Sequence, residues 1–270
     1  MIELQNGFPF VRFPAFAKSG NVVAAVATRK GGVSQAPFDS LNMSFSTGDD
    51  PEAVRENRRR FLSLFHIDPS SIISCHQVHG THVAAMTEAD RGRGALDRES
   101  AVPECDGLMT NARHVPLTMN FADCTPLLFY DPMNEAIAIS HGGWRGTAGD
   151  IGEKTVRLMS ARYGTRPEHL LVGIGPAIGG CSFEVGDDVI EAFQRLFTPA
   201  EMKTLVVKKP NGKYLFDLPR ANKKLLLRTG VLESHIDDCG ICTYCHDDMF
   251  FSYRKSGGTT GRHMAVIMLE

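Results

Sequence analysis

The chain has 270 residues, 43% of them hydrophobic, which is enough to build one large domain around a substantial core. Its 29 basic and 31 acidic residues leave a formal net charge of -2, so charge gives no general attraction to nucleic acid or to an anionic membrane. No signal-peptide pattern opens the chain, no apolar run approaches the roughly 20 residues that span a bilayer, and the seven cysteines are odd in number. We therefore expect a cytoplasmic protein with reduced thiols that binds neither nucleic acid nor membranes.

Apolar runs that predict strands occur in irregular order with amphipathic segments that predict helices. In chain order, we predict the strand Val22–Thr28, a helix that begins after Asp50, the strands Ser71–Cys75, Val83–Met86, Leu117–Phe121, Leu127–Tyr130 and Ala136–Ser140, the helix Asp150–Arg162, the strand Leu170–Ile174, the helices Asp187–Phe197 and Asp217–Arg228, and the strand Met264–Leu269. Several strand-like runs are almost continuously apolar, which is typical of strands covered on both faces. The pattern predicts an α+β fold, a single domain over residues 1–270 with layered mixed β-sheets and flanking helices.

The helix after Asp50 shows the signals on which these predictions depend. Asp50 is a typical N-cap residue and Pro51 fits the first turn. The apolar residues that follow share one face of the helix: Val54, Phe61, Leu62 and Phe65. We interpret the run Arg58–Arg60 as a solvated face of this helix rather than as a binding patch.

Three residues with the chemistry of metal ligands lie where an apolar run gives way to a turn. These residues are His79, Cys124 and His141. Two imidazoles and one thiolate suit Zn²⁺ or a copper ion, and three protein ligands leave a coordination position for water or substrate, as in catalytic sites. Because the residues are widely spaced in the sequence, two structural histidines and a buried cysteine are the alternative interpretation.

Arginines close to turn glycines predict an anion site. Arg29 precedes a glycine pair, Arg145 follows the glycine pair after His141, and Arg254 lies before the turn Thr260–Arg262. Glycine allows backbone N–H groups to approach a ligand, and the arginine fork suits phosphate or carboxylate. A structural ion pair is the commoner role for any one of these arginines, but their shared setting favours anion binding.

Short motifs follow one another through the chain from about Thr28 onward. They are Arg29–Ser34, Pro37–Asn42, Gly48–Asp50, Gln77–His79, Asp123–Pro126, His141–Gly146, Gly175–Gly179, Phe251–Arg254 and Thr260–Arg262. In this order they resemble the YfiH/YlmD-type laccase-domain family, also described as polyphenol oxidase or peptidoglycan editing factor. The chain departs from the family motif at Gly142, where the family usually has alanine.

The resemblance implies a purine nucleoside phosphorylase that also deaminates adenosine and cleaves methylthioadenosine. It places one zinc ion, with copper as the alternative metal, on the three catalytic residues His79, Cys124 and His141. The expected partners are a small-molecule nucleoside and phosphate. The expected substrate-binding residues are Arg29, Asn42, Gln77, Asp123, Arg145 and Arg254, and among them we assign phosphate to Arg29, Arg254 and Arg145.

Other classes of function are also compatible with these residues. One is a copper-dependent polyphenol oxidase, although the ten histidines include no His-X-His pair of the kind that several coppers require. Another is a cysteine hydrolase that acts on a peptidoglycan precursor, with Cys124 as nucleophile and His141 or His79 as base. A non-catalytic metal-binding interaction protein is the third.

The segment Asp238–His246 contains three further cysteines at CxxC spacing. They are Cys239, Cys242 and Cys245. A structural zinc site usually needs a second, distant pair of ligands, and the sequence offers no obvious one. We therefore predict that this segment is not a second catalytic metal centre, with Cys242 packed in the core and the other two thiols reduced near the surface.

Overall fold

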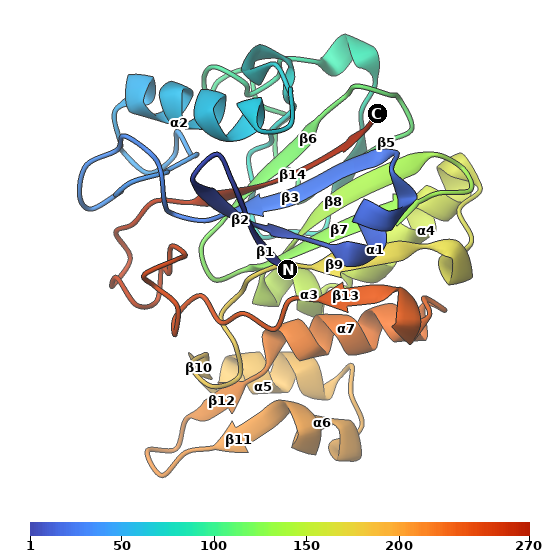
Figure 1. Ribbon diagram of the computed structural model, residues 1–270. Coiled ribbons are helices and arrows are strands. Elements are labelled where there is room, and N and C mark those ends of the chain that lie inside the picture. The colour runs from blue at the N-terminus through green and yellow to red at the C-terminus, as the bar shows by residue number, and fades with distance from the viewer.

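Two β-sheets packed face to face form the centre of the computed structural model, which describes residues 1–270 (Figure 1). One sheet has five antiparallel strands in the order β1 (Ile2–Gln5), β2 (Phe8–Arg12), β3 (Val22–Ala27), β14 (His263–Leu269) and β6 (Leu117–Phe121). The other has six strands in the order β13 (Ile236–Asp238), β9 (Leu171–Ile174), β7 (Thr125–Asp131), β8 (Ala136–Gly142), β5 (Gly107–Thr110) and β4 (Val83–Ala85). This second sheet is mixed, because β13 pairs with β9 and β4 pairs with β5 in parallel.

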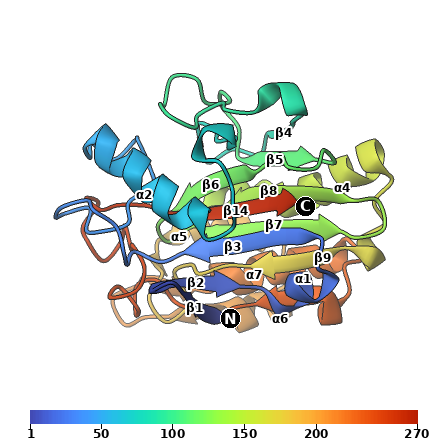
Figure 2. The same ribbon diagram turned by 45° about the horizontal axis from the view of Figure 1, so that its top comes forward.

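Helices cover the outer faces of both sheets, so the molecule has four layers (Figure 2). Helix α2 (Pro51–Ser63) packs on the five-stranded sheet, and α4 (Ile151–Tyr163) and α7 (Leu218–Arg228) pack on the six-stranded sheet. The remaining α-helices are α1 (Pro14–Ser19), α3 (Trp144–Ala148), α5 (Asp187–Gln194) and α6 (Pro199–Leu205). Short 3-10 helices span Pro69–Ser71, Glu88–Asp90, Pro167–His169 and Glu233–His235.

A small third sheet extends the molecule below α7 in the view of Figure 1. Its strands are β10 (Glu184–Val185), β12 (Tyr214–Phe216) and β11 (Val206–Lys208). Helices α5 and α6 pack against it around a core of their own, which is built from buried residues such as Phe193, Phe197 and Phe216. None of the helices is long and apolar enough to cross a bilayer.

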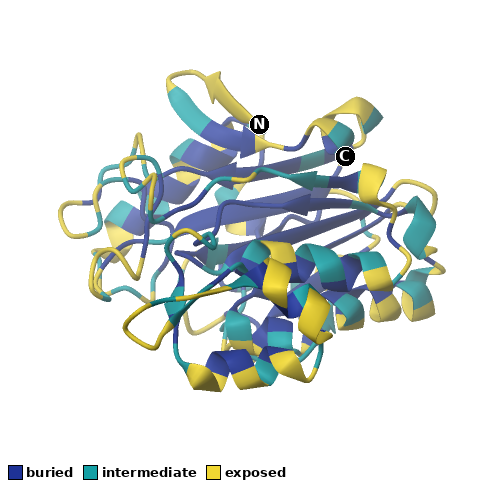
Figure 3. Ribbon diagram, turned by 90° about the horizontal axis from the view of Figure 1, so that it is seen from below, coloured by how far each residue is buried: buried dark blue, intermediate teal, exposed yellow.

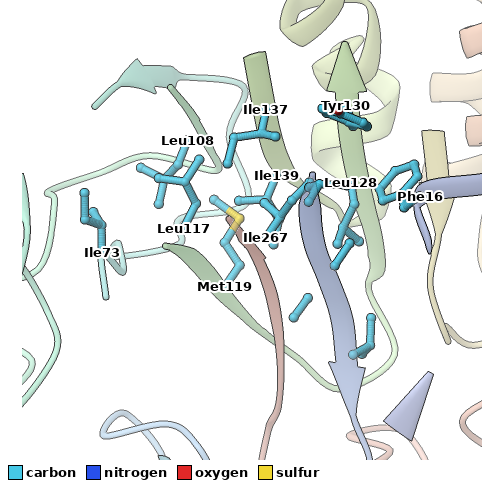
Figure 4. Close-up of a cluster of buried hydrophobic side chains, with 14 of the residues drawn as sticks. Phe16, Ile73, Leu108, Leu117, Met119, Leu128, Tyr130, Ile137, Ile139 and Ile267 are labelled. Atoms are coloured by element: carbon cyan, nitrogen blue, oxygen red, sulfur yellow. The ribbon is translucent and has the colours of Figure 1, made fainter. Parts of the chain in front are cut away.

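Strand β7 explains why the central runs of the sequence are almost continuously apolar. All of its residues are buried, and successive side chains point to opposite faces of the sheet. Leu128 and Tyr130 join the core between the two sheets, whereas Leu127 and Phe129 join the core under the helices. Figure 4 shows the first of these cores, in which Leu128 lies among side chains from both sheets.

The burial pattern corrects one sequence-based interpretation. Figure 3 shows that most strands of the two large sheets are buried, whereas β1 near the N-terminus is exposed, and that the helices expose their outer faces. The Arg58 side chain of α2 is nevertheless only 2% exposed. Its guanidinium group donates hydrogen bonds to the backbone oxygens of Met43, Gly94 and Ala95 and lies 4.4 Å from the ring centroid of Phe45. The interpretation of Arg58–Arg60 as a solvated face is therefore wrong for its first residue.

The predicted α+β class, with several sheets in one compact domain, is confirmed. The strand predicted at Ser71–Cys75 is wrong, because only isolated bridges form at Ile73 and Cys75. The helix predicted over Asp187–Phe197 ends at Gln194. The sequence analysis missed the helices α1, α3 and α6 and the strands β1, β2, β5 and β10 to β13.

The inter-sheet core gives a direct test of these layers. Replacing Leu128, which is fully buried, by alanine leaves a cavity and is expected to lower the free energy of unfolding by about 3 kcal/mol. The matched control is Leu4→Ala in β1, because Leu4 is 73% exposed and its loss is expected to change stability by less than about 0.5 kcal/mol. Chemical denaturation measures both values, and equal effects would contradict the layer assignment.

Candidate metal centre

The topology of the two sheets brings the three predicted ligands together at one end of the molecule. Cys124 lies in the turn between β6 and β7, and His141 lies near the end of β8, where it pairs with Pro126 at the start of β7. His79 comes from the loop that leads into β4. The three donor atoms lie within 4.8 Å of one another, and the rings of His79 and His141 are 4.8 Å apart between centroids.

A buried carboxylate that the sequence analysis missed holds two of these residues in place. Asp106 is fully buried and accepts hydrogen bonds from the backbone N–H groups of Val78, His79 and Gly80, at 3.2, 3.0 and 2.7 Å. Its Oδ1 atom is also 2.9 Å from Nδ1 of His141. That contact leaves Nε2 of His141 free to bind a metal, as carboxylate partners do in known zinc sites.

The same neighbours determine the protonation of Cys124. Burial opposes ionisation of the thiol, but the imidazoles of His141 and His79 outweigh this effect and lower the pKa of Cys124 to about 6. Burial disfavours the imidazolium form of His141, yet Cys124 and Asp106 raise its pKa to about 9. Without a metal, the site therefore contains a thiolate–imidazolium pair at neutral pH. A thiolate is the form of cysteine that binds metals.

Gly143 leaves the space in which the three side chains meet. A Cβ atom on Gly143 would lie 3.1 Å from Sγ of Cys124, 3.2 Å from Cδ2 of His79 and 3.6 Å from Cε1 of His141. Two of these distances are tighter than ordinary van der Waals contacts. Glycine is therefore needed here for close packing against the ligands.

The three ligands border a cavity of about 700 Å³. Four of the predicted substrate-binding residues line it: Gln77, Asp123, Arg145 and Arg254. The lining also contains three arginines that were not predicted as site residues: Arg58, Arg98 and Arg262. The lining thus contains five arginines but only three acidic residues, namely Asp97, Glu104 and Asp123. This excess of positive charge favours an anionic ligand.

Arg145 and Arg262 have guanidinium groups with donors to spare. Arg145 is exposed, its guanidinium group makes no hydrogen bond or ion pair, and this group lies 4.4 Å from the ring centroid of Trp144. Arg262 is half-buried and uses Nη1 to bind the backbone oxygens of Thr260 and Gly261. The motif Thr260–Arg262 was noted in the sequence, and its arginine beside a turn glycine was the signal that could have found Arg262.

The two remaining predicted residues, Arg29 and Asn42, do not line the cavity. The guanidinium group of Arg29 donates to the backbone oxygens of Asp39 and Asp247. The side chain of Asn42 is buried and binds its own loop, and its Oδ1 atom also accepts from the backbone N–H of Arg262. The assignment of phosphate to Arg29 therefore stays a prediction for a residue outside the cavity lining, whereas Asn42 contacts the backbone N–H of the lining residue Arg262.

Asp123 and Gln77 line the cavity, but their polar atoms hold the surrounding chain. Asp123 has a φ of 84° and accepts hydrogen bonds from Oγ1 of Thr243 and from the backbone N–H of Arg254, both at 2.7 Å. Gln77 pairs through its amide with the backbone N–H and oxygen of Asn120, both at 3.0 Å. These contacts hold the chain around Cys124, and the assignment of both residues to substrate binding stays a prediction.

The three cysteines of the segment Asp238–His246 do not form one group. Cys242 is buried, as predicted, but its neighbours are Cys245 and the distant Cys181, and the three sulphur atoms lie within 4.8 Å of one another. Cys239 is half-buried and packs against the inter-sheet core instead. The sequence offered no obvious distant ligand for this segment, and the structure shows that Cys181 is one.

Fold and site together define a two-sheet α+β protein with a three-ligand centre where the sheets end. The family model described as multi-copper polyphenol oxidoreductase laccase matches residues 23–270. A protein named purine nucleoside phosphorylase YlmD, from Geobacillus stearothermophilus, is 41% identical over 94% of this chain and 91% of its own length. A protein named adenosine deaminase RL5, from an unknown prokaryotic organism, is 32% identical over 92% of this chain and 94% of its own length.

The structural comparison agrees with the sequence comparison. The crystal structure of YlmD from Geobacillus stearothermophilus superimposes with a TM-score of 0.93 at 39% identity, covering 100% of this chain and 98% of that chain. The protein therefore belongs to the laccase-like family that contains YlmD and YfiH, as its motifs indicated. The names of its relatives support an enzyme.

The low pKa of Cys124 makes the protonation of the site measurable. In protein freed of metal by a chelator, the rate at which iodoacetamide alkylates Cys124 is expected to rise with pH around a midpoint near 6, because the thiolate is the reacting form. Peptide mass spectrometry separates Cys124 from the exposed Cys181 and Cys245. Zinc is expected to protect Cys124, and a midpoint near the ordinary thiol value of about 8.5 would contradict the ion-pair geometry.

Proposed function

We propose that the protein is a zinc-dependent purine nucleoside phosphorylase with adenosine deaminase activity. The main support is the combination of one three-ligand centre with a cavity whose lining carries more arginines than carboxylates. Phosphorolysis needs a bound phosphate, and deamination needs an activated water. Adenosine, inosine and guanosine are the proposed substrates, and methylthioadenosine belongs in the same assays. Nucleoside and phosphate are the proposed partners.

The donor set fits zinc. His79, Cys124 and His141 supply two imidazoles and a thiolate, and the contact between His141 and Asp106 has the form of a zinc ligand with its supporting carboxylate. Bound zinc supplies Lewis acidity at the floor of the cavity. The protein contributes the orientation of the ligands through Asp106 and the space for them through Gly143.

Phosphorolysis transfers the ribosyl group from the base to phosphate, so that base and ribose 1-phosphate are the products. The phosphate oxygen forms a bond to C1′ while the bond between C1′ and N9 of the purine breaks. Arg145 and Arg262 hold the phosphate in this proposal, because both offer unpaired N–H donors to the cavity. Arg254 is the third arginine of the group, although one of its N–H groups binds the backbone oxygen of Glu184.

The purine needs an apolar surface and a polar partner. Trp144, Phe183 and Tyr253 line the cavity and offer aromatic surface. Asn120 also lines it, and its Oδ1 atom is buried without a hydrogen-bond partner. An unpaired buried acceptor is costly, so a donor from the ligand improves the site as well as the binding. We assign Asn120 to the polar edge of the base.

Replacing Arg145 by alanine tests the phosphate assignment without disturbing the fold, because the guanidinium group of Arg145 makes no hydrogen bond or ion pair. The loss of a charged donor is expected to raise the KM for phosphate about tenfold or more. Adenosine deamination uses no phosphate and is expected to change less, with metal content unchanged. Arg157→Ala in α4 is the control, since Arg157 is an exposed helix residue. Equal loss of both activities would assign Arg145 to the nucleoside.

One observation also favours a cysteine hydrolase. Cys124, His141 and Asp106 are connected in the order of a nucleophile, a base and an orienting carboxylate.

The His₂Cys donor set likewise matches mononuclear copper centres. Neither the cysteine hydrolase nor the copper enzyme needs the arginine-rich cavity lining to bind phosphate, and for this reason we prefer the phosphorylase.

The Cys124→Ala variant separates these functions. For the zinc enzyme, metal content and nucleoside turnover are expected to fall together, because one of three ligands is lost. Metal analysis and product analysis with adenosine and inosine, with and without phosphate, measure both effects. A variant that keeps full zinc but loses activity would favour the nucleophile role. A strong visible absorption band in the copper-loaded protein, together with inactive zinc protein, would favour copper.

A further inference from the structure

Three cysteines outside the candidate metal centre form a second group of soft ligands. Cys181 comes from the loop between β9 and β10, and Cys242 and Cys245 come from the loop after β13. Their sulphur atoms lie within 4.8 Å of one another, and those of Cys181 and Cys245 are 3.5 Å apart. We propose that this thiol cluster is a second metal site, which holds a thiophilic closed-shell cation, Zn²⁺ or Cu⁺.

The spacing of the sulphur atoms fits a shared metal better than it fits a disulfide. A disulfide bond is about 2.05 Å long. Zinc–thiolate bonds of about 2.3 Å in tetrahedral geometry place two sulphurs about 3.8 Å apart. The observed 3.5 Å between Cys181 and Cys245 is close to the second value and far from the first.

Hydrogen-bond donors lie beside the sulphur atoms of the cluster. The backbone N–H of Gly179 donates to Sγ of Cys242 at 3.2 Å. The hydroxyl of Ser182 lies 3.4 Å from Sγ of Cys181 and 3.3 Å from Sγ of Cys245. Hydrogen bonds to sulphur stabilise the anionic form, and binding of the cation releases the thiol protons to solvent. No oxidation or reduction is involved. Solvent can reach a fourth position, since Cys181 and Cys245 are exposed.

The cluster joins two loops that support the first metal centre. The loops already touch, because Ala177 pairs with Cys242 and the backbone N–H of Thr243 binds the oxygen of Ala177 at 3.0 Å. Thr243 also donates to the carboxylate of Asp123, the residue before Cys124. A metal on the thiol cluster would therefore fasten the loops that fix the backbone of Asp123. Its role is structural, and it does not depend on the proposed nucleoside chemistry.

Metal content under reducing conditions tests the proposal. Wild-type protein reconstituted with excess zinc and then desalted is expected to retain two zinc ions per chain, and the Cys181→Ser/Cys245→Ser variant is expected to retain one. Cys239→Ser is the matched control, because Cys239 is a cysteine of the same segment outside the cluster, and it is expected to retain two. A parallel titration with Cu⁺ under anaerobic conditions distinguishes the metals, since a second equivalent taken up only from Cu⁺ identifies copper.

A measurement on the unaltered protein keeps the test independent of variant folding. In metal-loaded wild type, Cys181 and Cys245 are expected to resist alkylation, and chelation is expected to restore their reactivity, although both residues are exposed in the structure. Equal metal content in wild type and in the Cys181→Ser/Cys245→Ser variant, with zinc and with Cu⁺, would overturn the proposal, whereas one metal ion in wild type and none in the variant would contradict the first centre instead. A disulfide between Cys181 and Cys245 would lower the mass of the unreduced protein by two hydrogens relative to the reduced protein. This mass difference, together with no second metal bound after reduction, would also overturn the proposal.

Discussion

The carboxylate of Asp106 is the contact on which the candidate centre depends. It accepts hydrogen bonds from three successive backbone N–H groups at His79 and its two neighbours, and it orients the ring of His141. Hydrogen bonds to a charged partner contribute about 1.5–3 kcal/mol each. Burial opposes the ionised form of Asp106, yet His141 and the N–H groups of the loop lower its pKa below the ordinary value. One fully buried charge thus fixes both imidazoles relative to β5 and β8.

The third ligand is fixed by a different part of the chain. Cys124 follows Asp123, whose φ of 84° is unusual for a residue with a side chain. Contacts from Thr243 and Arg254 to the Asp123 carboxylate hold this conformation. The last 30 residues of the chain therefore help to complete a site whose candidate ligands come from residues 79 to 141. The pairing of β14 with β6 explains this, because it places residue 262 opposite the turn that carries Cys124.

Much of the fold and part of the site could be predicted from sequence. Long apolar runs predicted β6, β7, β8 and β14 with small errors at their ends, since strands buried on both faces leave a strong signal. Strands β10 to β13 have only two or three residues each, which is too short to leave a recognisable apolar pattern in the sequence. The ligand types of His79, Cys124 and His141 were visible, but Asp106 was not, because an isolated aspartate shows its role only through the fold. Cys181 was missed for the same reason: it lies 61 positions before Cys242.

The position of His79 favours metal binding over nucleophilic catalysis by Cys124. A cysteine, a histidine and a carboxylate suffice for a hydrolase, and the contacts among Cys124, His141 and Asp106 would complete that set without a second imidazole. Yet His79 adopts a φ of 60°, a conformation that costs free energy in a residue with a Cβ atom. The backbone N–H groups of His79 and of its two neighbours donate hydrogen bonds to Asp106, and these bonds hold His79 in this conformation. A metal that takes His79 as its third ligand would account for this arrangement, whereas a Cys–His–Asp triad makes no use of His79.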